Sequence, residues 1–286
     1  RRYCVTHRKP YTLKGYEKGR LFAKGLIMPF VEVKNGKILY SKFGIGAKTL
    51  VILPGLSLKS LDTYAEAVES AFSLFCNDYT VYVFDRLSEP GSDYTVYAMA
   101  DDTAQAMRFL GLSDCCIFGA SQGGMIAQCI AVKYPELVSK LALGSSCCRM
   151  NELFENTVRQ WGSLASKRDS HALNHDFVYR VYSEKTLEKF GEYLVAQAPH
   201  CTDSELQRFG RLDMASIGFD LYNEIKNIKC PTLVLGAGQD RVIGVDGSYE
   251  IAEQTGAELF VYDDYGHAVY DEAPDYRQRL KSFFDK

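Results

Sequence analysis

Residues 115–127 of this 286-residue chain read CCIFGASQGGMIA, and this stretch decides the fold. The apolar run 115–118 has the character of a buried strand, the run from Gly124 onward has that of a helix, and GASQG lies between them. A G-x-S-x-G pattern between a strand and a helix is typical of a nucleophile elbow, a sharp turn that holds a serine hydroxyl above a sheet. Glycines flank the serine because a side chain there would collide with neighbouring backbone. The stretch therefore predicts Ser121 as a nucleophile.

A carboxylate and a histidine follow in the order that this elbow predicts. Asp240 comes directly after the apolar run 231–239, and His267 comes shortly after the strand-like run 259–262. Each lies at the C-terminal end of a predicted strand, where open parallel sheets collect their ligand-binding loops. We therefore expect His267 to take the serine proton and Asp240 to orient the imidazole. Asp264 is a nearby alternative acid, but it shares a loop with His267.

Strand and helix patterns alternate along most of the chain. The first two strands form a predicted hairpin around Asn35-Gly36. Alternating β and α elements predict an α/β fold, with a mostly parallel twisted sheet and helices on both faces. We expect strands at 31–33, 38–43, 50–53, 80–84, 115–119, 140–144, 231–239 and 259–262, and helices at 61–75, 96–110, 123–133, 246–254 and 274–284.

Between residues 147 and 222 this alternation stops. The segment carries many charges, few β-branched runs, and aromatic residues at helix-compatible intervals. It predicts a helical cap inserted above the C-terminal edge of the sheet, between core segments 31–146 and 223–286. We expect most of the aromatic residues to hold the cap together and the others to line an apolar acyl or aromatic pocket, without a signal that tells which. They are Phe154, Trp161, Phe177, Tyr179, Tyr182, Phe190, Tyr193 and Phe209.

These features together resemble the α/β-hydrolase family. The resemblance runs from about residue 31 to residue 286, interrupted by the predicted cap. It rests on the elbow, on Gly-Gln-Asp-Arg at 238–241, on Gly266-His267, and on ILPGL at 52–56. The resemblance implies an α/β-hydrolase fold with a serine nucleophile.

Two loops depart from the family pattern. The family usually has a His-Gly pair after the third strand, and here Pro54 stands where the histidine is expected. Because an oxyanion hole of this kind uses backbone donors, the resemblance implies that the N–H groups of Leu56 and Gln122 form it, without support from a histidine side chain. Residues 85–92, DRLSEPGS, resemble a divergent form of the family's Asp-x-Arg-Gly-x-Gly loop.

The resemblance implies cleavage of a small-molecule carboxylic ester or lactone through an acyl-enzyme at Ser121. Carbon–carbon bond hydrolases, acyltransferases and aminopeptidases share the fold and stay open as alternatives, whereas the dehalogenase and epoxide-hydrolase branches use aspartate as nucleophile. A second class of function is a non-catalytic ligand-binding protein, which Pro54 favours. Taken singly, Ser121 also fits a plain turn, Asp240 a helix N-cap and His267 a loop residue.

The charge distribution argues against nucleic acid as a partner. The net charge is −3, so the chain has no overall basic field. Residues 1–25 carry eight Lys or Arg residues against Glu17 alone, and we interpret residues 1–30 as a solvated basic arm rather than a nucleic-acid or membrane tether. No apolar run approaches the ~18 residues of a membrane span, and no signal-peptide pattern is present. The oligomeric state has no signal in the sequence.

Cysteines and histidines give no pattern for a metal site. The nine cysteines lie mostly in apolar contexts without a C-x-x-C spacing, which favours buried packing in a reducing, cytoplasmic compartment. We expect the vicinal pair Cys147-Cys148 to pack in the same way. His171 and His175 have helical spacing but lack the glutamate of H-E-x-x-H. We expect no metal and, without a phosphate-binding glycine loop, no cofactor.

Overall fold

The structure is a computed structural model that describes the backbone of residues 20–23 and 26–286. Within these ranges it contains a nine-stranded sheet in the order β1-β2-β3-β5-β4-β6-β7-β8-β9. The pairs that link β5, β4, β6, β7, β8 and β9 are parallel, and β1, β2 and β3 extend the sheet with antiparallel pairs. The mostly parallel sheet is therefore confirmed. The strands are β1 Arg20–Ala23, β2 Leu26–Val33, β3 Gly36–Phe43, β4 Lys48–Leu53, β5 Tyr79–Leu87, β6 Cys115–Ala120, β7 Val138–Gly144, β8 Thr232–Gln239 and β9 Glu258–Gly266.

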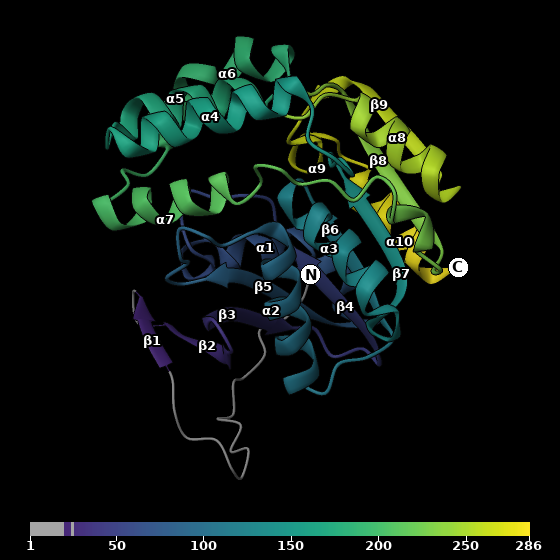
Figure 1. The fold of residues 1–286 in the computed structure, drawn as a ribbon. Helices are drawn as coiled ribbons and strands as arrows, with labels where there is room; N and C mark the ends of the chain where they lie inside the picture. Colours follow the sequence, from purple (N-terminus) through teal and green to yellow (C-terminus); the bar gives the residue numbers. More distant parts are fainter. Residues whose placement is uncertain (1–19, 24–25) are drawn as a thin grey trace.

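Helices cover both faces of the sheet, as predicted (Figure 1). Side chains alternate along β4, so that Val51 and Leu53 pack with α2, α3 and α8, while Leu50 and Ile52 pack with α1 and α10 on the opposite face. The expected helix at 61–75 is broken into α1 with a 3-10 turn on either side, a form of helix end that is common. The core helices are α1 Ala65–Ala71, α2 Val96–Phe109, α3 Gln122–Lys133, α8 Asp246–Thr255, α9 Val269–Glu272 and α10 Tyr276–Asp285.

A helical insertion separates β7 from β8, which confirms the predicted cap as a helical element. Helices α4, α5 and α6 lie farthest from the sheet, and α7 lies between them and the core (Figure 1). Each helix begins at a capping side chain that accepts a backbone N–H of the first turn, which satisfies donors that the helix itself cannot bind. The helices and their caps are α4 Glu152–Ser166 after Asn151, α5 Ser170–Val181 after Asp169, α6 Glu184–Gln197 after Ser183, and α7 Asp203–Met214 after Thr202.

The N-terminal part of the sheet begins earlier than the sequence indicates. Residues 20–23 and 26–30, part of the expected basic arm, lie in β1 and β2, whereas residues 1–19 fall outside the described part of the chain. The hairpin of β2 and β3 is confirmed, but Val33 pairs with Gly36, so its turn falls on residues 34–35. The limits of the two core segments and the cap stay a prediction. No helix in the described ranges is long and apolar enough to cross a membrane.

Strand β9 is longer than predicted, and this difference positions the site. Residues 263–266 continue the strand instead of forming a loop, and Gln239 at the end of β8 pairs with Gly266 at the end of β9. Asp240 directly follows Gln239, and His267 directly follows Gly266. The register of two neighbouring parallel strands thus brings the predicted acid and histidine side by side.

Candidate active site

Ser121 lies on a strained turn between β6 and α3. Its backbone adopts φ 52° and ψ −123°, a region that residues other than glycine rarely occupy. A Cβ at position 119 would lie 2.4 Å from the carbonyl oxygen of Gly123, and one at position 123 would lie 2.0 Å from that of Leu53. The backbone N–H of Ser121 donates to the carbonyl of Gly144 at 2.8 Å. The glycines therefore permit the close approach of helix and strand that the sequence predicts.

The structure brings together Ser121, His267 and Asp240. His267 Nε2 lies 2.9 Å from Ser121 Oγ, and His267 Nδ1 lies 2.7 Å from Asp240 Oδ2. All three side chains are buried, with His267 only 3% exposed. The alternative acid, Asp264, is exposed and lies in β9. The imidazole is thus placed between one hydroxyl and one carboxylate.

His267 and two backbone donors favour the ionised form of Asp240. Burial alone would raise the pKa of Asp240, but His267 and the hydrogen bonds to the carboxylate outweigh this effect and leave the pKa below its usual value. Oδ1 accepts the backbone N–H groups of Val242 at 2.8 Å and Ile243 at 2.9 Å. Oδ2 is then left to face the imidazole.

The loop of residues 54–61, which follows β4, passes directly beside Ser121. A Cβ on Gly55 would lie 3.2 Å from Ser121 Cβ and 3.8 Å from its Oγ. Leu56, the next residue, lines the cavity in front of the serine. Gln122 directly follows Ser121 in the chain and begins α3. Leu56 shares the cavity with Ser121, and Gln122 is its neighbour in sequence.

The side chain of Gln122 has a second contact that the sequence did not indicate. Its Nε2 donates to the carbonyl of Leu212 in α7 at 2.7 Å and to Ser216 Oγ at 3.0 Å. Both bonds are buried. They attach the elbow to the helical insertion.

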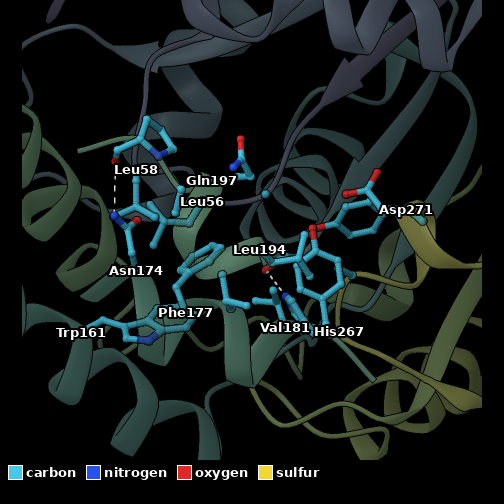
Figure 2. A pocket seen from close by; sticks show the side chains of 18 residues that line it. Leu56, Leu58, Trp161, Asn174, Phe177, Val181, Leu194, Gln197, His267 and Asp271 are labelled. Carbon is cyan, nitrogen blue, oxygen red and sulfur yellow. Dashed lines mark hydrogen bonds between the residues drawn. The ribbon is translucent and has the colours of Figure 1, made fainter. Parts of the chain in front are cut away.

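A cavity of about 350 Å³ opens onto Ser121 and His267 between the core and the insertion (Figure 2). Trp161 and Phe177, whose ring centroids lie 4.8 Å apart, form part of its aromatic wall. Trp161 Nε1 donates to Asp176 at 2.8 Å, so the polar edge of the indole is satisfied. The apolar lining comes from both parts of the structure and includes Leu56, Leu58, Trp161, Phe177, Val181 and Leu194.

Sequence reasoning named some of these residues without assigning them to the pocket. Trp161, Phe177 and Tyr182 belong to the aromatic set predicted in the cap, and all three line the cavity. Asn174 and Asp271 also line it but were missed. They have no local signal, because a single polar residue on an amphipathic helix is indistinguishable in sequence from a surface residue.

The junction between α5 and α6 is bonded to the loops that carry Asp240 and His267. The backbone N–H of Ala268 donates to the carbonyl of Val181 at 2.7 Å, and Arg241 Nη2 donates to the carbonyl of Tyr182 at 2.7 Å. Glu272 accepts from Ser183 Oγ at 2.6 Å and from the backbone N–H of Gly266 at 3.1 Å. The insertion thus holds the backbone after His267 directly and the backbone before it through Glu272. Sequence reasoning missed Glu272, which has no motif around it.

His175, Cys147 and Cys148, which the sequence singled out, are not among the residues that line the cavity. The ring of His175 stacks on Tyr179 at a centroid distance of 4.4 Å. Within the described ranges, no group of three or more His, Cys, Asp and Glu side chains is arranged to hold a metal ion. Cys147 and Cys148 are buried, and burial raises the pKa of the Cys148 thiol to about 12. A thiol of this kind stays protonated and unreactive near neutral pH.

Comparison with known proteins identifies the family. The family model described as "Alpha/beta hydrolase family" matches residues 50–276, which is most of the chain. This chain belongs to the alpha/beta hydrolase family. The chain is also similar to a protein of Rhizobium rhizogenes named "Putative carbamate hydrolase RutD", with 25% identity over 236 residues that cover 78% of this chain and 87% of the relative.

Solved structures of alpha/beta hydrolases share the fold at low sequence identity. MGS-M2, an alpha/beta hydrolase enzyme from a Medee basin deep-sea metagenome library, is similar with a TM-score of 0.79 and 22% identity, over 90% of this chain and 98% of that one. The enol-lactonase of Burkholderia xenovorans LB400 is similar with a TM-score of 0.76 and 20% identity, over 90% and 100%. These likenesses confirm the alpha/beta hydrolase fold, including its helical insertion.

Proposed function

We propose that this protein is a serine hydrolase that cleaves a small, uncharged carboxylic ester or lactone, with Ser121, His267 and Asp240 as its catalytic triad. The proposal is carried by one observation, the continuous chain of contacts from Ser121 Oγ through the imidazole to Asp240 Oδ2 at 2.9 and 2.7 Å. A hydroxyl becomes a strong nucleophile only when a base in hydrogen-bonding range removes its proton. The family membership supports hydrolysis as the reaction class.

In the first step, Ser121 Oγ attacks the carbonyl carbon of the ester while its proton passes to His267 Nε2. The imidazolium that forms keeps its other proton on Nδ1, directed at the ionised Asp240. Collapse of the tetrahedral intermediate breaks the bond to the leaving alcohol, which takes the proton from Nε2. The acyl group is left on Ser121.

In the second step, water enters and His267 takes one of its protons as the oxygen attacks the acyl carbon. The intermediate then releases Ser121 Oγ, which recovers a proton from the imidazolium. The products are a carboxylic acid and the free enzyme. For a lactone, the acid and the alcohol leave as one molecule.

The backbone N–H groups of Leu56 and Gln122 are proposed to bind the oxyanion in both steps. The close contact of Gly55 with Ser121 and the position of Gln122 at the start of α3 support this assignment. Loss of one donor of this kind typically costs about two to three orders of magnitude in rate. Pro54 does not prevent this arrangement, because the donors belong to the backbone.

The lining of the cavity supports an uncharged, largely apolar acyl group. Among the described residues, those that line the cavity include no lysine or arginine, so a carboxylate on the substrate would lose its hydration without gaining a cationic partner. One water molecule takes up about 30 Å³ in the liquid. The cavity of about 350 Å³ therefore has room for on the order of a dozen chemical groups of that size. A short-chain ester or a small lactone fits this volume. Carbon–carbon bond hydrolysis, acyl transfer and peptide cleavage stay as alternatives on the same triad.

Turnover of p-nitrophenyl esters of increasing acyl length tests this function. We expect hydrolysis of short-chain esters by the wild-type chain, none above background by Ser121→Ala, and wild-type rates for the matched control Ser166→Ala, which changes an exposed serine on α4. Wild-type protein that is folded, binds small esters and never hydrolyses them would instead favour a non-catalytic binding protein.

A further inference from the structure

Two departures from the family pattern meet in space. Pro54, which replaces the expected histidine, follows β4, and Arg86 lies near the end of β5, the strand paired in parallel with β4. Arg86 is 5% exposed, and its Nη2 donates to the carbonyl oxygen of Pro54. The side chain of one divergent loop thus binds the backbone of the other.

The preceding residue fastens the other end of the 54–61 loop. Asp85 Oδ2 accepts the backbone N–H of Leu61 at 2.9 Å. Asp85 Oδ1 accepts the backbone N–H of Arg86 at 2.8 Å and Nη2 of Arg208, from α7, at 2.9 Å. Asp85 and Arg86 therefore hold both ends of the loop that carries Leu56.

Arg86 is not explained as one half of a simple ion pair. Its guanidinium and the Asp85 carboxylate make no direct side-chain hydrogen bond among the bonds of the described residues, because the carboxylate oxygens bind backbone N–H groups and Arg208. Burial lowers the pKa of the Arg86 guanidinium, with Asp85 acting in the opposite direction. Burial of a guanidinium costs the free energy of its hydration. Because Arg86 Nη2 donates to the Pro54 carbonyl oxygen, we explain its burial by the position in which it holds that carbonyl.

A small cavity beside the 54–61 loop supports this explanation of Arg86. A small cavity of about 10 Å³, room for about one water, is lined by Leu56, Arg86 and Gln122 among others. Arg86 Nε and Gln122 Oε1 are buried without a hydrogen-bond partner in the described part of the chain. Arg86 therefore lines the same small cavity as the two residues whose N–H groups are proposed to face the substrate.

We infer that Arg86 is the positioning residue of the oxyanion hole: by holding the Pro54 carbonyl, it fixes the peptide planes that follow and directs the N–H of Leu56 toward the carbonyl that Ser121 attacks. This inference rests on the proposed function. Arg86 acts through Pro54 and touches no substrate. It takes over the support that a histidine gives in relatives with the usual loop.

The inference predicts a loss in transition-state stabilisation with little change in substrate binding. Arg86→Met removes the donors and the charge but keeps a long side chain, so the 54–61 loop loses its anchor at Pro54. We expect kcat for a short p-nitrophenyl ester to fall by about 10- to 100-fold, somewhat less than the loss of a whole oxyanion donor, with KM changed by less than about threefold. Arg86→Lys should restore part of kcat, because an ammonium can still donate to a carbonyl.

A trifluoromethyl ketone separates positioning from general support of the fold. Ser121 Oγ adds to its carbonyl carbon, the proton moves to His267, and the resulting oxyanion needs the same donors as the reaction. We expect the affinity of Arg86→Met for this inhibitor to fall by the same factor as kcat/KM. As a matched control, Tyr79→Phe removes a buried hydroxyl that donates to Asp285 at 2.8 Å on the far side of the core, and it should lower Tm without changing inhibitor affinity.

Arg86→Met that folds, with kcat and inhibitor affinity within about twofold of wild type, would overturn the inference whatever its Tm. If methionine prevents folding, Arg86→Gln decides the same comparison with a shorter, uncharged side chain. A wild-type chain that neither hydrolyses esters nor forms the ketone adduct would refute the proposed function, and the inference with it. Wild-type activity with an unaffected Arg86 variant would refute the inference alone.

Discussion

Replacement of Asp240 by asparagine reverses the direction of one hydrogen bond. Asp240 Oδ1 accepts two backbone N–H groups, from Val242 and Ile243, and Oδ2 faces His267 Nδ1 at 2.7 Å. An asparagine has only one acceptor oxygen, and the two backbone donors require it to take the Oδ1 position. The NH₂ group then faces Nδ1, which must give up its proton to accept a hydrogen bond. The proton moves to Nε2, the nitrogen that faces Ser121.

An imidazole with its proton on Nε2 cannot accept the proton of Ser121. In serine protease triads the same substitution lowers kcat by about 10⁴-fold, which corresponds to about 5.4 kcal/mol of activation free energy. We expect a loss of this size for Asp240→Asn in p-nitrophenyl butyrate hydrolysis at pH 7.5, with a small change in KM. The control is Asp264→Asn, at an exposed position in β9, which should keep wild-type kcat. Folded Asp240→Asn with kcat within tenfold of wild type, or a large loss in Asp264→Asn, would refute the reasoning.

Gly123→Ala places a Cβ 2.0 Å from the Leu53 carbonyl oxygen. It should lower the free energy of unfolding in urea by about 3 kcal/mol or more and abolish turnover. The control Gly210→Ala, whose Cβ meets nothing closer than 3.4 Å, should do neither. Phe177→Ala enlarges the cavity and should shift the preferred acyl length upward by several carbons in a chain-length profile; an unchanged profile would exclude Phe177 from the acyl site. The folded-state pKa of Asp240 lies below its usual 3.8, so its ionised form stabilises the fold above about pH 4, and this contribution is lost as the pH falls below that value. The free energy of unfolding should therefore fall less between pH 6 and pH 3 in Asp240→Asn than in the wild type. Equal losses in the two proteins would contradict the assignment.

The elbow and its partners were predictable because local sequence encodes them. Gly119 and Gly123 mark a turn that only small residues permit, and the predicted strands before Asp240 and His267 place those residues at one edge of the sheet. The structure adds the reason for their contact, which is the pairing of Gln239 with Gly266 in the last two strands. Strand register of this kind depends on tertiary pairing, which a single sequence does not reveal.

The surroundings of the site could not be predicted, because they depend on contacts between distant segments. Glu272 binds Ser183 across 89 positions, and Arg86 binds Pro54 across 32. Neither their residue type nor the periodicity of the sequence around them distinguishes Glu272 and Arg86 from charged surface residues. Trp161 and Phe177 belong to an aromatic set that was expected to divide between packing in the cap and lining a pocket, and helical spacing alone did not show which members face the cavity. The turn at residues 34–35 was displaced by one position because strand pairing, and not the Asn-Gly signal, set its register.

The most direct test of the central claim is the site of covalent labelling by a fluorophosphonate, located by peptide mass spectrometry. The account predicts one adduct per chain on Ser121, lost in Ser121→Ala and strongly slowed in Asp240→Asn, because phosphonylation requires the hydroxyl that His267 activates. Folded wild-type protein that takes up no label, or an adduct on another side chain with Ser121 unmodified, would contradict the assignment of Ser121 as the nucleophile.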